Sequence, residues 1–213
     1  MDTDDLIATL AADAAPVRKG AVWRRWALAV LLALAISAVV MTLGWGVRPD
    51  LHHAMRTSPF WMKGGYTLAL GVAGLLIVER AGRPGVRLGW GVALAGAAVV
   101  TILALAAHEL MGMPMAGWRA DMMGQSAQVC PWRILAISAP VFVIAMLTLR
   151  WMAPTRPAVA GAAAGLLAGG LGATVYGLHC QETAAAFTAV WYTLGMALWP
   201  LVGALIGRRL LRW

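Results

Sequence analysis

Two cysteines, Cys130 and Cys180, are the side chains with the most distinctive chemistry in this chain of 213 residues. Thiols form disulfides, bind soft metals or carry out redox chemistry, depending on their compartment and their surroundings. The two residues are far apart in the sequence and form no CxxC motif, which disfavours a disulfide-exchange enzyme. A structural disulfide, a regulatory thiol pair and a metal site all remain open at this point.

Histidine and methionine side chains accompany the cysteines. Thiolate, thioether and imidazole groups suit soft metals such as Cu(I) and Zn²⁺, so His108 and His179, each at the end of a long apolar stretch, are candidate ligands. No spacing matches a closed metal site, so no resident cofactor is predicted, and only a transient soft metal at the cysteine pair is retained. Five methionines within residues 111–123 are expected to form a loop packed against the rest of the protein (Met111, Met113, Met115, Met122 and Met123).

The composition indicates which elements must position these side chains. Apolar residues make up 61% of the chain and charged residues only 12%, whereas a soluble domain carries about 25% charged residues. Such a chain lacks the charges to cover a water-exposed surface, which excludes a soluble globular domain and a disordered chain. Its long apolar stretches do not alternate with polar residues, which disfavours a β-barrel. The composition therefore predicts an α-helical membrane protein.

Six long gaps between charged residues predict six membrane-spanning helices, because about 20 apolar residues cross the hydrocarbon core. The predicted helices lie near residues 26–46, 61–79, 88–107, 132–150, 158–178 and 185–206. In the fifth helix, Gly161, Gly165 and Gly169 recur every four residues and should form a face for close packing within the bundle. The predicted fold class is all-α, a polytopic six-transmembrane-helix bundle of residues 23–213 that follows a tail of residues 1–22.

The distribution of lysine and arginine predicts the orientation of the bundle. Twelve of the 17 lie in the tail, the second and fourth loops and the C-terminus, whereas five lie in the first and third loops. By the positive-inside rule, both termini are expected in the cytoplasm, and both cysteines and all four histidines should emerge on the periplasmic side. The net charge of +8 is then mostly a topology signal, so the lipid bilayer is a partner and direct binding to nucleic acid is not predicted.

The tail differs from everything that follows it. Leu6, Ile7 and Leu10 have helical spacing and form one apolar stripe. Asp4 and Asp5 fall in the first helical turn, where the helix dipole favours anions. A helix this short is marginal alone in water, so its apolar face needs a surface. Two interpretations remain open: the helix packs on the bundle or the membrane, or it binds in a groove of a basic cytosolic partner.

Four segments of the chain together resemble a known family. They are TDDLIATLAAD at Thr3–Asp13, GVRPDL at Gly46–Leu51, CPWRI at Cys130–Ile134 and LHCQE at Leu178–Glu182. With these segments the whole chain is similar to the NrsF family, the negative regulators of sigma factor F. The resemblance implies an anti-sigma factor of the bacterial inner membrane and not an enzyme. Such a protein keeps an extracytoplasmic-function sigma factor from RNA polymerase until a periplasmic stress signal, here redox or metal stress, releases it.

The resemblance also implies roles for particular residues. Cys130 and Cys180 become the expected sensing pair. The expected sigma-binding residues are those of the tail (Asp4, Asp5, Leu6, Ile7 and Leu10). Two other classes of function compete with this interpretation. A membrane thiol–quinone oxidoreductase fits poorly with two cysteines outside a CxxC motif, and a soft-metal transporter lacks a charged residue at the centre of any span.

Overall fold

The computed structural model describes residues 2–12, 20–83, 89–152 and 154–212, and this part of the chain is helical, with no strand. Six helices are long and apolar enough to cross a membrane: α2 (Ala21–Gly44), α4 (Ser58–Ala81), α5 (Gly89–Met111), α7 (Cys130–Arg150), α8 (Pro157–Tyr176), and a last one in which α9 (Ala185–Phe187), a π-helical turn (Thr188–Tyr192) and α10 (Thr193–Leu210) follow one another. Three helices are shorter: α1 (Thr3–Ala12), α3 (Leu51–Ala54) and α6 (Met115–Met123). The predicted all-α class and the six spans are confirmed, with boundaries that differ by five residues or fewer.

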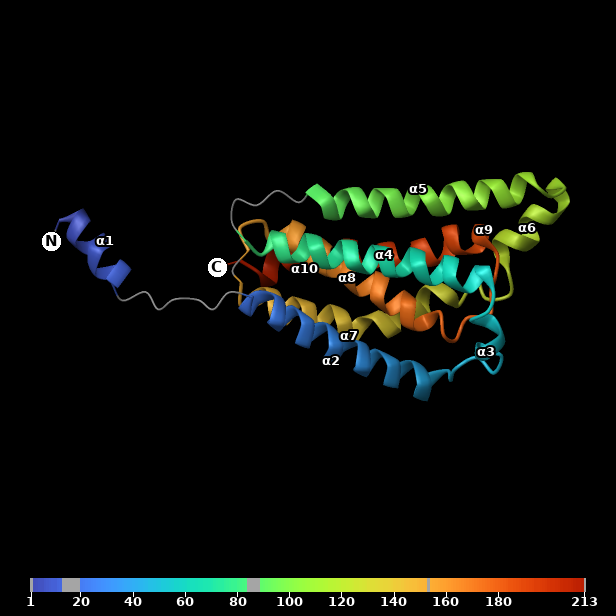
Figure 1. The fold of residues 1–213 in the computed structure, drawn as a ribbon, viewed down its shortest axis with the longest axis horizontal. Helices are drawn as coiled ribbons and strands as arrows, with labels where there is room; N and C mark the ends of the chain where they lie inside the picture. The colour runs from blue at the N-terminus through green and yellow to red at the C-terminus, as the bar shows by residue number, and fades with distance from the viewer. Residues whose placement is uncertain (1, 13–19, 84–88, 153, 213) are drawn as a thin grey trace.

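Helix α8 runs through the centre of the bundle and packs against α10, α4 and α7 (Figure 1). Its glycines explain this position. A Cβ atom at Gly161, Gly165 or Gly169 would meet the backbone of α10, one at Gly170 would meet the backbone of α4, and one at Gly172 would meet α7. Small residues allow helix backbones to approach closely in lipid. The predicted close-packing face is therefore confirmed, and its partner is α10.

Helix α2 packs along α7, and a side chain of α2 donates a hydrogen bond to the backbone of α7 next to a proline. Pro140 lies inside α7, where its missing N–H leaves the carbonyl four residues earlier without a helical donor. Ser37 Oγ on α2 donates to the carbonyl of Ile137 at 2.8 Å, and Trp199 Nε1 on α10 donates to that of Leu135 at 3.2 Å. These two carbonyls flank that of Ala136, the one left without a helical donor, so side chains of two neighbouring helices bond to the backbone on either side of it.

The segment between α5 and α7 differs from its prediction, because it contains the helix α6. Trp118 Nε1 donates to the carbonyl of Leu110 at 2.8 Å, and Trp191 Nε1 donates to that of Met122 at 2.8 Å. Met111 and Met115, by contrast, are 82% and 80% exposed. The expectation that the methionines pack against the bundle is wrong for these two residues, because tryptophans make the anchoring contacts.

Helix α1 lies apart from the bundle (Figure 1), and every side chain described in it is exposed. Leu6 is 43% and Ile7 is 58% exposed, and Asp4 and Asp5 lie in the first turn, as predicted. The side chain of Leu10 is outside the described part of the structure. The structure therefore does not have α1 packed on the bundle, and the side chains of Leu6 and Ile7 are available to a partner.

Candidate functional site

Three segments that are distant in the sequence meet at one end of the bundle. They are the loop after α2, the first turn of α7, and residues 178–184 between α8 and α9 (Figure 1). We call residues 178–184, which have no helical structure, the strap, and we call this end of the bundle the thiol end. The three segments carry the GVRPDL, CPWRI and LHCQE motifs, so most of the distinctive sequence of this chain lies in one place.

Both cysteines lie at the thiol end, Cys130 as the first residue of α7 and Cys180 in the strap. They are free thiols, 0% and 3% exposed, and belong to one cluster of buried residues. The rings of Tyr176 and Tyr192 lie 5.6 Å apart in the same cluster. These two tyrosines and the two cysteines are all buried together. Thiols shielded in this way are unreactive until the surrounding structure opens.

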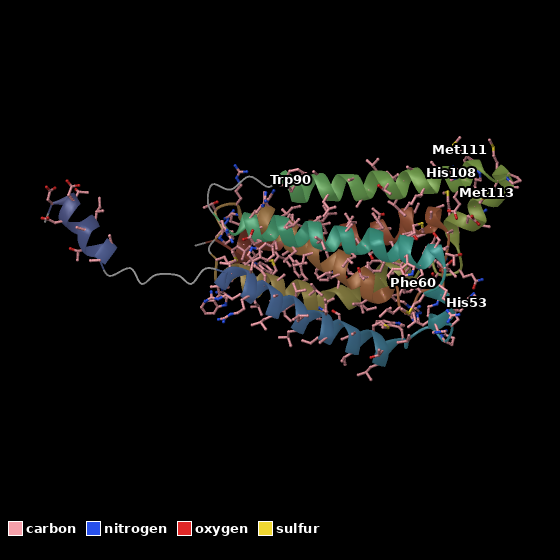
Figure 2. All side chains as sticks on the ribbon, in the orientation of Figure 1. His53, Phe60, Trp90, His108, Met111 and Met113 are labelled. Atoms are coloured by element: carbon pink, nitrogen blue, oxygen red, sulfur yellow. The ribbon has the colours of Figure 1, made fainter. Side chains whose placement is uncertain are left out.

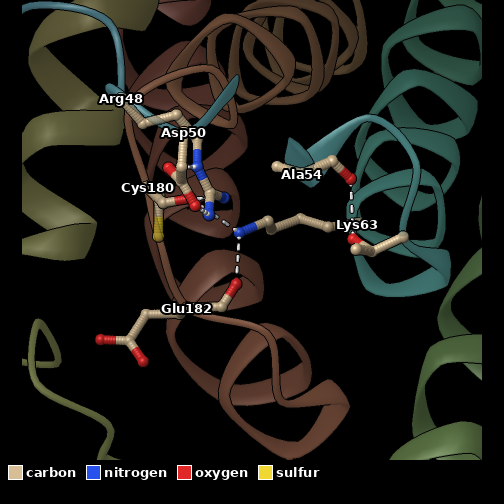
Figure 3. A network of polar contacts seen from close by, with 7 residues as sticks. Arg48, Asp50, Ala54, Lys63, Cys180 and Glu182 are labelled. Atoms are coloured by element: carbon tan, nitrogen blue, oxygen red, sulfur yellow. Dashed lines mark hydrogen bonds and ion pairs between the residues drawn. The ribbon is translucent and has the colours of Figure 1, made fainter. Parts of the chain in front are cut away.

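Two buried cations hold the strap (Figure 3). Lys63 Nζ on α4 donates to the carbonyl of Glu182 at 2.6 Å and to that of Cys180 at 3.3 Å. Arg48 Nη1, from the loop after α2, donates to the same Cys180 carbonyl at 3.1 Å, and its backbone N–H bonds to Leu178 O at 3.0 Å. Buried backbone carbonyls need hydrogen-bond partners within the protein, and these cations supply them to the carbonyls of Cys180 and Glu182.

Asp50 orients the guanidinium of Arg48. Its two carboxylate oxygens accept hydrogen bonds from Arg48 Nε and Nη2, each at 2.7 Å, which is the bidentate geometry that makes such pairs strong. Hydrogen bonding to Arg48 lowers the pKa of the Asp50 carboxyl below its ordinary value, and the same bond raises the pKa of Arg48. Arg48 is therefore charged and directed at the strap.

His179 connects the strap to two other segments. Its Nδ1 lies 2.9 Å from the carbonyl oxygen of Gly46, and its Nε2 lies 3.1 Å from Arg133 Nη1 on α7. A carbonyl only accepts and a guanidinium only donates, so both bonds form together only in the neutral imidazole with its proton on Nδ1. Both ring nitrogens of this candidate metal ligand are thus already in use.

The other histidines lie on the surface of the same end of the bundle. His108, the second candidate ligand, is exposed at the end of α5, and His53 is exposed on α3 (Figure 2). Among the described residues, no three His, Cys, Asp or Glu side chains are grouped so that they could hold a metal ion. The structure thus brings Cys130, Cys180 and His179 to one end of the bundle and leaves His108 on the surface.

Two glutamates tie the surrounding segments to the strap and to the helix after it. Glu182 Oε1 accepts hydrogen bonds from the backbone N–H groups of Gln125 at 2.8 Å and Ser126 at 2.9 Å, and from Ser126 Oγ at 2.9 Å, just before α7 begins. Glu109 Oε2 on α5 accepts the N–H of Ala186 at 2.9 Å, in the first turn of α9. A carboxylate at a helix N-terminus satisfies a donor that has no partner within the helix.

The sequence analysis missed the roles of Arg48, Lys63 and Glu182. All three entered it as charges that bound the predicted spans, and Arg48 and Glu182 entered it also as members of the GVRPDL and LHCQE segments. One signal for Lys63 was present. Its charge lies among apolar residues inside the segment that forms α4. Burying an ionisable group in a membrane-spanning helix costs free energy unless the group is paired. The predicted sigma-binding residues lie at the opposite end of the bundle from the thiols, on α1 (Figure 1).

Comparison with known proteins places the whole chain among similar sequences. The family described as "Negative regulator of sigma F", NrsF, matches residues 10–213. The "Anti-sigma-F factor NrsF" of Caulobacter vibrioides is 44% identical, and the "Probable anti-sigma-F factor NrsF" of Azospira oryzae is 40% identical, each over the full length of both chains. No solved structure matches. The family match includes all three segments of the thiol end.

Proposed function

Because this chain belongs to the family of negative regulators of sigma F, we propose that it is an inner-membrane anti-sigma factor. It binds an extracytoplasmic-function sigma factor through α1 and releases it when Cys130 and Cys180 react with a periplasmic oxidant or thiophilic metal. The family is one of regulators and not a class of enzymes. Two relatives named anti-sigma factors match over their full length, which supports the same role for the whole of this chain.

The state of α1 carries the sigma-binding part of the proposal. Leu6 and Ile7 are exposed on a helix that also bears Asp4 and Asp5. Full burial of a Leu or Ile side chain stabilises a contact by about 1.5–3 kcal/mol, and complementary charge guides association. The DNA-binding faces of a sigma factor are basic, so an acidic amphipathic helix suits them. The proposal keeps the predicted division of the chain into a sigma-binding tail of residues 1–22 and a membrane domain of residues 23–213.

The orientation follows from the excess of lysine and arginine at the end that carries both termini. With both termini in the cytoplasm, α1 faces the sigma factor and the thiol end faces the periplasm. An oxidant that takes two electrons and two protons from the two thiols leaves a disulfide, whereas a thiophilic metal displaces the two protons and bridges the thiolates. His179 and His108 remain candidate additional ligands for such a transient metal.

Either reaction requires the strap to move, because the thiols are buried. Disulfide formation needs Cα atoms about 4.4–6.8 Å apart. The strap contacts the loop after α2 through Arg48 and contacts α7 through His179 and Arg133. A displaced strap therefore pulls on the ends of two helices, and α2 is the helix to which α1 is joined.

The test of the proposal is retention of the sigma factor in membrane fractions. Leu6→Asp with Ile7→Asp should release the sigma factor, because an unpaired charge in an apolar interface costs several kcal/mol. Ala8→Asp with Ala12→Asp is the matched control, since it adds the same two charges to exposed residues of α1 off the Leu6–Ile7 stripe and should retain the sigma factor. Retention by the double variant at normal expression would refute binding through α1.

A further inference from the structure

A groove of about 410 Å³ lies at the end of the bundle to which α1 is joined. One wall comes from the first turns of α2 and the other from the last turn of α7 and the residues after it. Its lining is mostly apolar, with one cation (Val22, Arg25, Trp26, Leu28, Thr148, Trp151 and Met152). Leu28 is 62% and Trp151 is 84% exposed. The groove is thus an apolar surface with a cationic rim.

We propose that this groove binds the apolar face of α1 of the same chain, so that α1 alternates between the groove and the sigma factor. The second of these partners rests on the function proposed above, whereas docking in the groove does not depend on it. Docking pairs an exposed apolar helix face with an exposed apolar groove at the same end of the bundle.

The length of the connection allows α1 to fold back. Eight residues, 13–20, separate the end of α1 from the start of α2, and eight residues span up to about 26–29 Å when extended. The groove residues of α2 lie within its first eight residues, which is a rise of about 10 Å. Helix α1, of ten residues, is about 15 Å long. It can therefore lie along the groove without any movement of α2.

The charges of the two surfaces are complementary. Asp2 and Asp4 lie four and three residues before Leu6 and Ile7, and residues with this spacing are neighbours on a helix surface. The carboxylates therefore flank the apolar stripe. Arg25 lines the groove, and neither it nor Arg24 makes an ion pair within the described residues. Docking of the stripe brings acidic side chains to a basic rim.

The position of the groove gives docking a regulatory consequence. Its second wall includes Thr148, near the end of α7, and Cys130 is the first residue of the same helix. A tilt of α7 at the thiol end therefore changes the width of the groove. Because the groove and the sigma factor bind the same face of α1, a groove that holds α1 better leaves less of it for the sigma factor.

Crosslinking of full-length protein in lipid nanodiscs tests this docking without a sigma factor. In a Cys130→Ser/Cys180→Ser background, Ile7→Cys is paired with Thr148→Cys, and the control pairs Ala8→Cys with Thr148→Cys. Residues 7 and 8 have nearly the same tether but point to different faces of α1. We expect a short bismaleimide to join the Ile7→Cys pair at least about ten times faster than the control. Adding purified sigma factor should slow this reaction, and so should Arg25→Glu.

Equal rates for the two pairs, or no crosslinking in either, overturn the docking, including the case in which lipid chains fill the groove. If added sigma factor binds without slowing the reaction, the alternation is overturned. Co-sedimentation of sigma factor with the same nanodiscs separates the two proposals. Crosslinking at the expected ratio without sigma binding refutes the anti-sigma function and leaves the docking intact. A photo-crosslinking residue at Ile7 or at Ala8 of the otherwise native chain supplies the same comparison if the cysteine-free background does not fold.

Discussion

The two ends of the bundle are built in opposite ways. At the thiol end, the strap is bonded to Arg48 and Lys63, and both thiols are buried. At the other end, the described side chains of α1 are exposed and the groove beside α2 is open. Segments with many buried bonds open rarely, whereas segments with few buried contacts exchange readily. The thiol end therefore keeps a single arrangement until its thiols react, whereas the other end can exchange partners.

The largest expected effect is on stability at the thiol end. Lys63→Met leaves Glu182 O without its donor and leaves Cys180 O with Arg48 alone. It should lower the free energy of unfolding by about 2–4 kcal/mol, because buried acceptors lose their partners. Unfolding in detergent micelles, followed by tryptophan fluorescence, measures this. Arg56→Met removes an exposed cation and should change stability by less than about 0.5 kcal/mol. Equal losses of unfolding free energy in both variants would contradict the proposed difference between the two ends of the bundle.

The second expected effect is protection of the thiols. Cys130 and Cys180 in intact cells should react with a membrane-impermeant maleimide about a hundred times more slowly than an exposed thiol, because reaction requires local opening. The control is Gln181→Cys with both native cysteines replaced by serine, since Gln181 is the exposed neighbour of Cys180. Fast labelling of the native pair contradicts the closed thiol end. Failure to label the control in intact cells contradicts the proposed orientation.

A smaller effect is a dependence on pH through Asp50. Hydrogen bonding to Arg48 lowers the pKa of Asp50 below its ordinary value of 3.8. A carboxyl with a lowered pKa stabilises the fold fully above its ordinary pKa and loses that contribution as the pH falls through the folded value. The stability gap between wild type and Asp50→Asn should therefore be constant above about pH 5 and should shrink below about pH 4. Unfolding measured at pH 6 and pH 3 checks this, and a gap that stays constant argues against the pair.

The smallest effect is expected at the end of the bundle near α1. Trp90, in the first turn of α5 at that end (Figure 2), is 77% exposed. Trp90→Ala should change the free energy of unfolding by less than about 0.5 kcal/mol, although loss of a core tryptophan costs about 3–5 kcal/mol. The same detergent assay measures it. A loss above about 2 kcal/mol, a core-like value, would remove the distinction between the two ends.

Local patterns were sufficient to predict the six long helices of this fold. Hydropathy located the six spans because crossing a bilayer depends on a run of apolar residues and not on tertiary contacts. The spacing of Gly161, Gly165 and Gly169 predicted a packing face for the same local reason. Helix α6 was missed, because a short amphipathic segment between spans carries no comparable hydropathy signal. The roles of Arg48 and Lys63 were also missed, because a charge near a span end looks the same whether it faces water or a buried carbonyl.

The sequence by itself determined the membrane class, the six candidate spans, the resemblance to sigma F regulators and the acidic amphipathic character of α1, since each depends on residues close together in the chain. Only the tertiary structure decided that GVRPDL, CPWRI and LHCQE meet at one end, that Arg48 and Lys63 bond to the strap, and that both thiols are buried. These contacts join residues as far apart as 48 and 180. Close packing of α8 with α4, α7 and α10 brings them together, and no short-range pattern specifies which distant groups such packing joins.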